Sequence, residues 1–276
     1  VRRTMSTAFA PGKCILFGEH AVVYGHPAVA VSIDSGVEIT IEESEDWEIN
    51  NQYNTDGYEK FNPKKHPHIQ HIIRNLFNYE GKPLRINVQS NLFSGAGLGS
   101  SAALSNAMGA ALHQFTKPGK EIDLIKLSKI GHSAEAATQE GRASPTDSAA
   151  SSLGGCVVVS GERIDTLEHV FDTSLVTPEG KRSWSIHHAE LHKNINQSWL
   201  VLGFTGQSSP TGKMVSGVAE RLKQNHELYE EMKSIENITI AGLTALKAGN
   251  LEAVGMAMNS CHEKLKILGV SNELLD

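Results

Sequence analysis

The stretch SGAGLGSSAALSNAMGAAL, residues 94–112, joins a glycine-rich turn to a run of helix-forming residues. Residues 84–88 before it alternate apolar and polar side chains, which predicts a half-buried strand. A helix is expected from about Ser100, because Met108 and Leu112 then share one apolar face. The order of strand, bare turn and helix suits a bound phosphate: glycines let the backbone come close, and the first helical N–H groups point at the anion.

The same stretch also fits a purely structural turn. Ser100 and Ser101 are typical caps for a packed, alanine-rich helix that binds no ligand. The Walker pattern GxxxxGK[ST] is absent, and the dinucleotide pattern GxGxxG is only partly matched at residues 95–100. From composition alone, the phosphate loop and the capped turn stay equally open.

Strands and helices are expected along the rest of the chain, without an internal repeat. Further strands are expected at residues 28–33 and 37–41, separated by a turn at 34–36, at 156–160, and buried at 198–204. Helices are expected at residues 66–77, 121–138, 148–153, 212–232 and 236–266, the last broken near residue 249. Residues 42–66 are predicted to be an irregular excursion, and residues 165–197 a junction with a strand or two.

Bulk composition indicates a globular protein and disfavours several classes of function. A chain of 276 residues is long enough for one large domain or two ordinary ones. Its 25 basic and 31 acidic residues include no basic block, which disfavours nucleic-acid binding. No apolar run approaches the roughly 18 residues that span a membrane. Cys14, Cys156 and Cys261 lack zinc-site spacing, so reduced thiols in a cytoplasmic protein are expected.

A second candidate segment is APGKCILFGEHAVVYGHPA, residues 10–28. Lys13, Glu19 and His20 lie within eight residues of one another, and together they suit a polar, acidic substrate. Taken one at a time, they are more typical of a surface lysine, a solvated glutamate and a structural histidine.

A third candidate is ASPTD, which ends at Asp147, with Glu135 upstream on a predicted helix. Such a pair of carboxylates can hold Mg²⁺ and orient a hydroxyl group. Asp147 also precedes the predicted helix SAASSL, where its side chain can act as an N-cap. The two interpretations are compatible.

Read together, the three segments resemble the GHMP family of small-molecule kinases. Residues 10–28 are similar to its first motif, Gly95–Ala103 to its motif GxGLGSSAA, and Ala143–Asp147 with Gly154-Gly155 to its third landmark. Segments 66–76 and 258–271 extend the likeness over nearly the whole chain. The run GEHAVVYG favours the branch that acts on mevalonate over the galactokinase and homoserine kinase branches, and ASPTD is similar to the archaeal form.

The resemblance implies an α+β fold of two domains. Residues 1–170 would form the N-terminal ATP-binding domain, similar to domain 2 of ribosomal protein S5, and residues 171–276 a ferredoxin-like C-terminal domain. The implied activity is ATP-dependent phosphorylation of mevalonate to 5-phosphomevalonate in isoprenoid synthesis, with Mg²⁺. A homodimer in the cytoplasm, with no nucleic-acid or membrane partner, is expected. The alternatives are a GHMP kinase for phosphomevalonate or a sugar, and a non-catalytic nucleotide-binding protein.

The resemblance also assigns roles to matching positions. Asp147 would be the catalytic carboxylate, and Lys13 would lie near the transferred phosphoryl group. Glu19, His20 and Thr205 would bind substrate, and Ser101 and Glu135 would hold Mg²⁺. The triphosphate would be wrapped by Gly95, Ala96, Gly97, Leu98, Gly99, Ser100 and Ser101.

The chain departs from the family pattern in three places. Phe93 stands where a proline is usual, which loosens the turn before Gly95. The separation of Glu135 and Asp147 is one residue longer than usual. Either an insertion lies at Glu140-Gly141, or Glu140 replaces Glu135 as the metal ligand. The chain ends at NELLD, before a third glycine-rich motif, so the C-terminal domain is expected to be incomplete.

Overall fold

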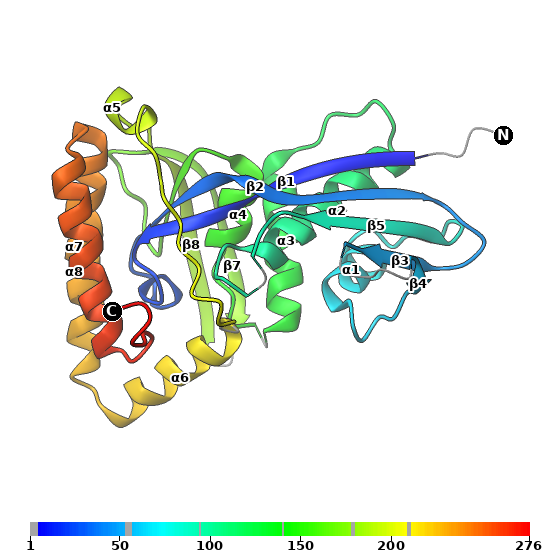
Figure 1. Ribbon diagram of the computed structural model, residues 1–276. Helices are drawn as coiled ribbons and strands as arrows, with labels where there is room; N and C mark the ends of the chain where they lie inside the picture. Colours follow the sequence, from blue (N-terminus) through cyan, green and yellow to red (C-terminus); the bar gives the residue numbers. More distant parts are fainter. Residues whose placement is uncertain (1–4, 53–56, 94, 140, 178–179, 209–210) are drawn as a thin grey trace. The chain divides into compact units, whose positions relative to one another are not determined.

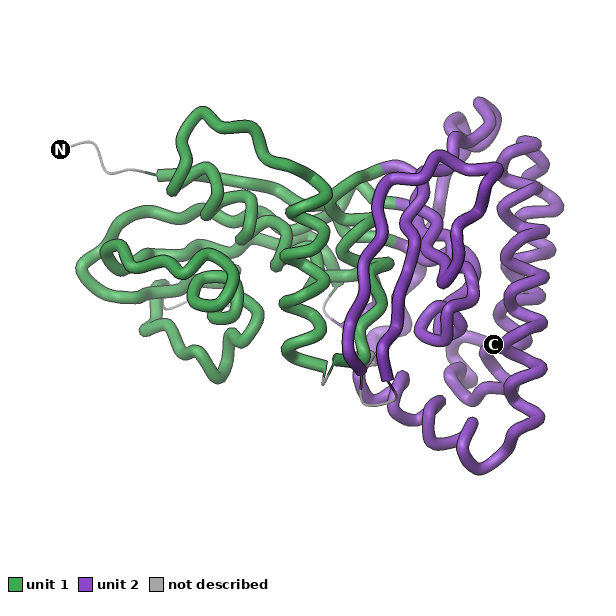
Figure 2. The backbone as a smooth tube through the Cα atoms, turned by 180° about the vertical axis from the view of Figure 1, so that it is seen from behind, with its two compact units in different colours: residues 1–13, 32–93, 98–154 green, residues 14–31, 94–97, 155–276 purple. Residues whose placement is uncertain are grey.

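The computed structural model describes residues 5–52, 57–93, 95–139, 141–177, 180–208 and 211–276 (Figure 1). The chain divides into two compact units, and each unit combines segments that are distant in sequence (Figure 2). The first unit consists of Val1–Lys13, Ser32–Phe93 and Leu98–Gly154, and the second of Cys14–Val31, Ser94–Gly97 and Gly155–Asp276. Two long strands, β1 (Met5–Phe17) and β2 (Ala28–Glu43), therefore contribute residues to both units.

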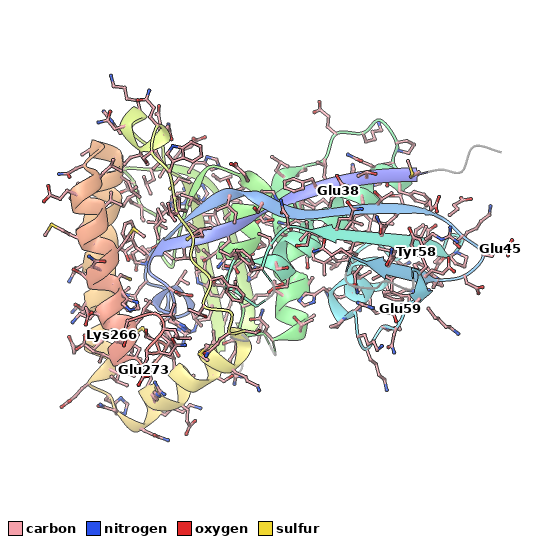
Figure 3. The ribbon with its side chains drawn as sticks, in the orientation of Figure 1. Glu38, Glu45, Tyr58, Glu59, Lys266 and Glu273 are labelled. Atoms are coloured by element: carbon pink, nitrogen blue, oxygen red, sulfur yellow. The ribbon has the colours of Figure 1, made fainter. Side chains whose placement is uncertain are left out.

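Strands of the first unit follow the order β4-β3-β5-β2, and β1 also pairs with β2. They are β3 (Glu48–Asn51), β4 (Glu59–Lys60) and β5 (Leu84–Ser90). β5 runs antiparallel to β2 and parallel to β3. Side chains of β2 alternate as a sheet with one covered face requires: Val37 and Ile39 are buried, whereas Glu38 between them is exposed (Figure 3).

Helices of the first unit cover the apolar face of these strands. They are α1 (Pro67–His71), which continues as a π-helical turn η2 (Ile72–Leu76), α2 (Ser100–Thr116), α3 (Leu124–Thr138) and α4 (Thr146–Leu153). Ile72, Met108 and Leu112 pack with Ile39 and Ile86 in one core. The glycine-rich turn is thus followed by a helix that this core anchors.

The second unit pairs the first residues of β2 with three further strands, in the order β2-β6-β8-β7. They are β6 (Cys156–Ser160), β7 (Glu168–Thr177) and β8 (Gly180–His188), and all these pairings are antiparallel. The helical elements are η1 (Ala21–Tyr24), α5 (Lys193–Asn196), α6 (Thr211–Gln224), α7 (Leu228–Ala248) and α8 (Leu251–Ile267). α7 and α8 lie side by side (Figure 1), and Leu243 and Val254 pack on Phe17, Val29 and Val158.

Several predicted elements are confirmed. The strand predicted over 84–88 is β5, the strand over 156–160 is β6, and the helix predicted from Ser100 is α2. The predicted helix break near residue 249 is also present. Gly249 ends α7 with a left-handed backbone, and the Asn250 side chain caps α8 by accepting a hydrogen bond from Ala253 N–H.

The predicted turn at residues 34–36 is wrong, because β2 runs through it without a break. A glycine is needed at position 36 for another reason. A Cβ atom there would collide with the Ala10 carbonyl oxygen and the Phe9 ring of β1. Gly36 therefore permits a close approach of two strands, and the local sequence cannot distinguish this role from a turn. The excursion predicted over 42–66 is wrong in part, since it includes β3 and β4.

The buried strand predicted over 198–204 is also wrong. This segment forms no strand pairing with the described residues, and Trp199 and Val201 are 93 % and 89 % exposed. An apolar run forms a buried strand only when a neighbouring strand supplies hydrogen-bond partners for its backbone. The helix boundary predicted between 232 and 236 lies earlier, at Asn225–Glu227, where Asn225 Oδ1 accepts a hydrogen bond from Glu227 N–H.

Within the described residues, the helices are too short or too polar to cross a bilayer.

Candidate functional site

Lys13 and Asp147 form an ion pair inside the first unit. Lys13 lies on β1 and is only 4 % exposed, and its Nζ is 3.2 Å from Asp147 Oδ1. Asp147 lies in the first turn of α4, and its side chain is 30 % exposed. A buried ammonium group is costly unless a counter-charge compensates it. The pair therefore places one carboxylate that solvent can reach beside one ammonium that is held in the interior.

The start of α2 lies beside this pair. Lys13 N–H donates a 2.9 Å hydrogen bond to the Leu98 carbonyl oxygen, which ties β1 to the residue before Gly99. A Cβ atom at Gly99 would lie 2.9 Å from Lys13 Cγ and 3.6 Å from Asp147 Oδ2. Gly99 also has φ of +70°, which favours glycine. Three segments far apart in the sequence thus meet at one point of the first unit.

Gly99 is the N-cap of α2, and no side chain among the described residues caps this end. The prediction that Ser100 or Ser101 caps the helix is therefore wrong, since both lie within α2. The first N–H groups of an α-helix have no intrahelical acceptor, and here no described side chain caps them instead. The positive end of the helix dipole also lies here, so this end of α2 favours an anion.

Asp147 does not cap α4 either. The N-cap position of this helix is Pro145, and Asp147 is inside the first turn. The structural alternative for Asp147 is thus wrong. Its carboxylate contributes to the favourable charge at the helix start and also faces Lys13.

The remaining loop glycines belong to the second unit. Gly95 and Gly97 have φ of +68° and +74°, with Ala96 between them. A Cβ atom at Gly95 would collide with Ser208, so this position also needs a glycine for space.

Glu135 lies on α3 and is buried. Gln139 Nε2 donates a 2.7 Å hydrogen bond to its Oε2, and His68 Nε2 is 3.2 Å from its Oε1. The His68 contact lacks hydrogen-bond geometry, so Oε1 accepts no hydrogen bond from the described residues. A buried carboxylate oxygen of this kind is costly unless it has a ligand. The alternative ligand Glu140 lies outside the described residues.

Metal ligation by protein side chains alone has little support here. The described His, Cys, Asp and Glu residues form no group of three or more with the geometry of a metal site. Mg²⁺ does not require one, because it commonly binds one or two carboxylates and completes its octahedron with water and phosphate oxygens. Glu135 fits that donor set. Ser101 lies in the first turn of α2, where its hydroxyl is available as a neutral oxygen ligand.

Glu19 and His20 lie in a tight turn of the second unit. Glu19 is exposed, and His20 has φ of +62°, a left-handed conformation that is rare for residues other than glycine. Burial lowers the pKa of His20, and the neighbouring Glu19 carboxylate opposes this shift. Strained backbone is typical of functional sites. Motif matching alone gave no sign of this strain.

Thr205 lies in the extended segment that follows the exposed residues of 198–204. Its Oγ1 accepts a 3.3 Å hydrogen bond from Gln207 N–H, which forms a local turn. Thr205 belongs to the second unit, as do Glu19 and His20. The structure therefore brings together Lys13, Gly99 and Asp147 in the first unit, and it leaves the three predicted substrate residues in the second.

Two contacts of the Glu135 carboxylate were missed by the sequence reasoning. Gln139 lies one helical turn beyond Glu135, so the i,i+4 spacing on the predicted helix was a usable signal. His68 comes from α1, and no local pattern links it to α3.

Comparisons with known proteins agree with the segments described above. Residues 67–155 match the family model for the GHMP kinases N terminal domain. The chain is 32 % identical over 272 residues to mevalonate kinase from Methanothermobacter thermautotrophicus, and the match covers 98 % of this chain and 80 % of that protein.

Two solved structures share the fold. Mevalonate kinase of Methanococcus jannaschii superimposes with a TM-score of 0.67 at 24 % identity, covering 98 % of this chain and 81 % of that one. Phosphomevalonate kinase of Streptococcus pneumoniae, in complex with phosphomevalonate and AMPPNP, gives a TM-score of 0.70 at 17 % identity, covering 95 % and 80 %. Because kinases with different acceptors share this fold, the fold alone does not select the acceptor.

Proposed function

The chain belongs to the GHMP kinase family, and from this membership we propose that it phosphorylates mevalonate with ATP, giving 5-phosphomevalonate and ADP. The predicted α+β GHMP kinase fold is confirmed by the structural neighbours. Curated archaeal relatives that cover nearly the whole chain are mevalonate kinases, which supports this acceptor. The observation that carries the proposal is the ion pair of buried Lys13 with partly exposed Asp147, beside the uncapped start of α2.

Phosphoryl transfer from ATP requires alignment, charge stabilisation and removal of a proton from the attacking hydroxyl group. Asp147 would accept that proton, and its partly exposed carboxylate in the first turn of α4 supports this role. Lys13, 3.2 Å from the Asp147 carboxylate, would stabilise the negative charge that develops on the attacking oxygen. The proton moves to a carboxylate oxygen of Asp147, and the terminal phosphoryl group moves from ATP to the hydroxyl oxygen.

The start of α2 would hold the phosphates of ATP. Gly99, Ser100 and Ser101 offer backbone N–H groups there, and the preceding loop residues Gly95, Ala96, Gly97 and Leu98 would continue the cradle. Because β1 is hydrogen-bonded to Leu98, the cradle and Lys13 are tied together. This link would keep the terminal phosphate within reach of the ammonium group.

Glu135 and Ser101 would hold Mg²⁺. The buried Oε1 of Glu135, which accepts no hydrogen bond from the described residues, supports this assignment. When bound, Mg²⁺ would neutralise phosphate charge and orient the phosphate chain. The Gln139 hydrogen bond would fix the orientation of the Glu135 carboxylate, as outer partners of metal ligands commonly do.

Glu19, His20 and Thr205 would bind the acceptor. A neutral His20 suits this role, because its ring can donate one hydrogen bond and accept another from a hydroxyl or carboxylate group. The two-domain assignment over 1–170 and 171–276, the homodimer and the cytoplasmic location remain predictions.

A non-catalytic nucleotide-binding protein is the less favoured alternative. A protein that only binds ATP has no use for a carboxylate beside a buried ammonium group, and burying that charge is costly. A phosphorylated acceptor would need further cations near Asp147, and Arg142 is the one that the sequence offers close by.

An assay of ADP release with mevalonate, phosphomevalonate and galactose tests the acceptor. We expect kcat/KM for mevalonate to exceed both others by at least about 100-fold, the discrimination that a site built around specific polar groups provides. Equal kcat/KM for the three acceptors would contradict the assignment of mevalonate as the substrate. ATP binding without turnover of any acceptor would favour the nucleotide-binding alternative.

A further inference from the structure

The backbone on both sides of Asp147 accepts hydrogen bonds from buried side chains of other helices. His132 of α3 donates from Nε2 to the Ala143 carbonyl oxygen at 2.9 Å, because a carbonyl oxygen can only accept. Asn106 of α2 donates from Nδ2 to the Ser148 carbonyl oxygen at 2.9 Å. One contact thus holds the loop that leads to Asp147, and the other holds the helix that follows it.

The Asn106 contact depends on a glycine of the third helix. Gly131 of α3 lies against both partners: a Cβ atom there would collide with Asn106 Oδ1 and would lie 3.0 Å from Ser148 Cβ. Gly131 therefore lets α2, α3 and α4 come together at one point. His132, the next residue of α3, makes the second contact.

Both donors are buried, so neither hydrogen bond can be exchanged for one to water. Asn106 is fully buried, and His132 is 3 % exposed. Loss of either donor removes a buried hydrogen bond, which is costly. Two such contacts define the position of the backbone at Asp147 more tightly than α4 alone would.

The contacts also connect Asp147 to the phosphate end of α2. Asn106 lies less than two turns after Ser100, on the same helix whose first residue follows Gly99. A rigid α2 therefore fixes the distance between the start of the helix and Ser148. The Lys13–Asp147 separation of 3.2 Å depends on α2 as well, because Lys13 packs against Gly99 at the start of this helix.

We propose that Asn106 and His132 are positioning residues that hold the Asp147 carboxylate in line with Lys13 and the start of α2. The proposal rests on the phosphotransfer proposed above. Asn106 lies after the motif Gly95–Ala103, and His132 lies outside all three candidate segments. They act through the Ala143 and Ser148 carbonyl groups and need not touch substrate.

Three variants test the proposal, because loss of positioning should lower kcat and leave KM nearly unchanged. Asn106→Leu and His132→Met remove the donor and keep a side chain of similar size, so kcat should fall about 10- to 100-fold, the cost of a misplacement near 1 Å. KM for ATP and for mevalonate should stay within about three-fold, since the binding groups are unchanged. His132→Gln retains an N–H donor close to the position of Nε2, so it should recover most of the lost kcat.

A matched control separates positioning from loss of stability. Thr239 of α7 is a fully buried polar residue whose Oγ1 donates to the Ile235 carbonyl oxygen, inside the second unit. Thr239→Val should lower the melting temperature while kcat stays within two-fold of wild type. If Asn106→Leu does not fold, Asn106→Ala, which also lacks a donor, and the two His132 variants decide. Folded donor-free variants with wild-type kcat would overturn the proposal, and so would equal kcat for His132→Gln and His132→Met.

The test remains separate from the choice of acceptor. If wild type prefers an alcohol other than mevalonate, the assigned substrate is wrong, yet the ratio of variant to wild-type kcat with that alcohol still tests positioning. A crystal structure of Asn106→Leu gives a readout without activity. The Lys13 Nζ to Asp147 Oδ1 distance should exceed 4 Å, and an unchanged distance would contradict the proposal.

Discussion

Replacing Gly99 by alanine should damage catalysis through the Lys13 side chain. The new Cβ atom would lie 2.9 Å from Lys13 Cγ, closer than carbon atoms approach without displacement. Lys13 Cγ is in the middle of the side chain, so the whole stem must shift. The residue also has φ of +70°, where an alanine costs about 1–2 kcal/mol of folding free energy.

The catalytic effect follows from the ion-pair geometry. At an effective dielectric constant of about 20, opposite charges at 3.2 Å attract by about 5 kcal/mol, and a retreat of about 1 Å removes about 1 kcal/mol. Misalignment of the reacting groups adds to this loss. We therefore expect kcat to fall about 10- to 100-fold in Gly99→Ala, measured by coupled ADP release with saturating ATP and mevalonate.

Gly119→Ala is the matched control. Gly119 has φ of +76°, and a Cβ atom there would meet no atom within 4 Å. The left-handed backbone should cost each variant about 1–2 kcal/mol of stability, but only Gly99→Ala should displace Lys13 and lose activity. Equal kcat for the two variants would show that the space beside Lys13 has no catalytic importance.

Three further predictions follow from the same structure. Lys13→Met should lower kcat about 10²- to 10³-fold, since the proposed mechanism uses this buried charge to stabilise the transition state. An effect on KM alone, in steady-state kinetics, would make Lys13 a binding residue. Glu135→Gln should raise the free Mg²⁺ concentration needed for half-maximal rate about ten-fold, whereas an unchanged Mg²⁺ titration would exclude this ligand. The free energy of unfolding should fall as the pH drops below about 6.5, because burial lowers the pKa of His187 in the folded chain. The unfolded chain then takes up a proton at a higher pH than the folded chain, which favours unfolding. Melting temperatures between pH 7.5 and 5.5 should show this fall, with a shallower slope in His187→Gln.

The His187 prediction has a direct geometric basis. Its ring is fully buried, accepts a hydrogen bond from Ile164 N–H at Nε2, and donates from Nδ1 to the Val158 carbonyl oxygen. Only the neutral tautomer satisfies both contacts. Equal pH slopes for wild type and His187→Gln would place the acid sensitivity in other histidines.

Local sequence signals predicted the elements that local interactions determine. The helix from Ser100 follows a glycine turn, and the break at Gly249 uses a left-handed glycine and an asparagine cap, all within a few residues. Such signals act over one or two turns of chain, and the structure agrees with them.

Most of the errors involve partners from distant segments. The boundary between α6 and α7 is an exception, because Asn225 forms it through a local hydrogen bond. Gly36 resembles a turn residue in sequence, but it serves a close approach by β1. Trp199 and Val201 resemble a buried strand, yet the described residues provide no neighbouring strand for them. The pairing of Lys13 with Asp147 could likewise be inferred only from a family resemblance, because no spacing rule links β1 to α4.

The most direct measurement of the central claim is the rate of phosphoryl transfer in a single turnover of Asp147→Ala. ATP affinity, measured by calorimetry, should stay within about three-fold of wild type, because the start of α2 is intact. Transfer to mevalonate should slow by about 10²- to 10⁴-fold, the usual contribution of a general base. A transfer rate within two-fold of wild type would contradict the assignment of Asp147 as the proton acceptor beside Lys13.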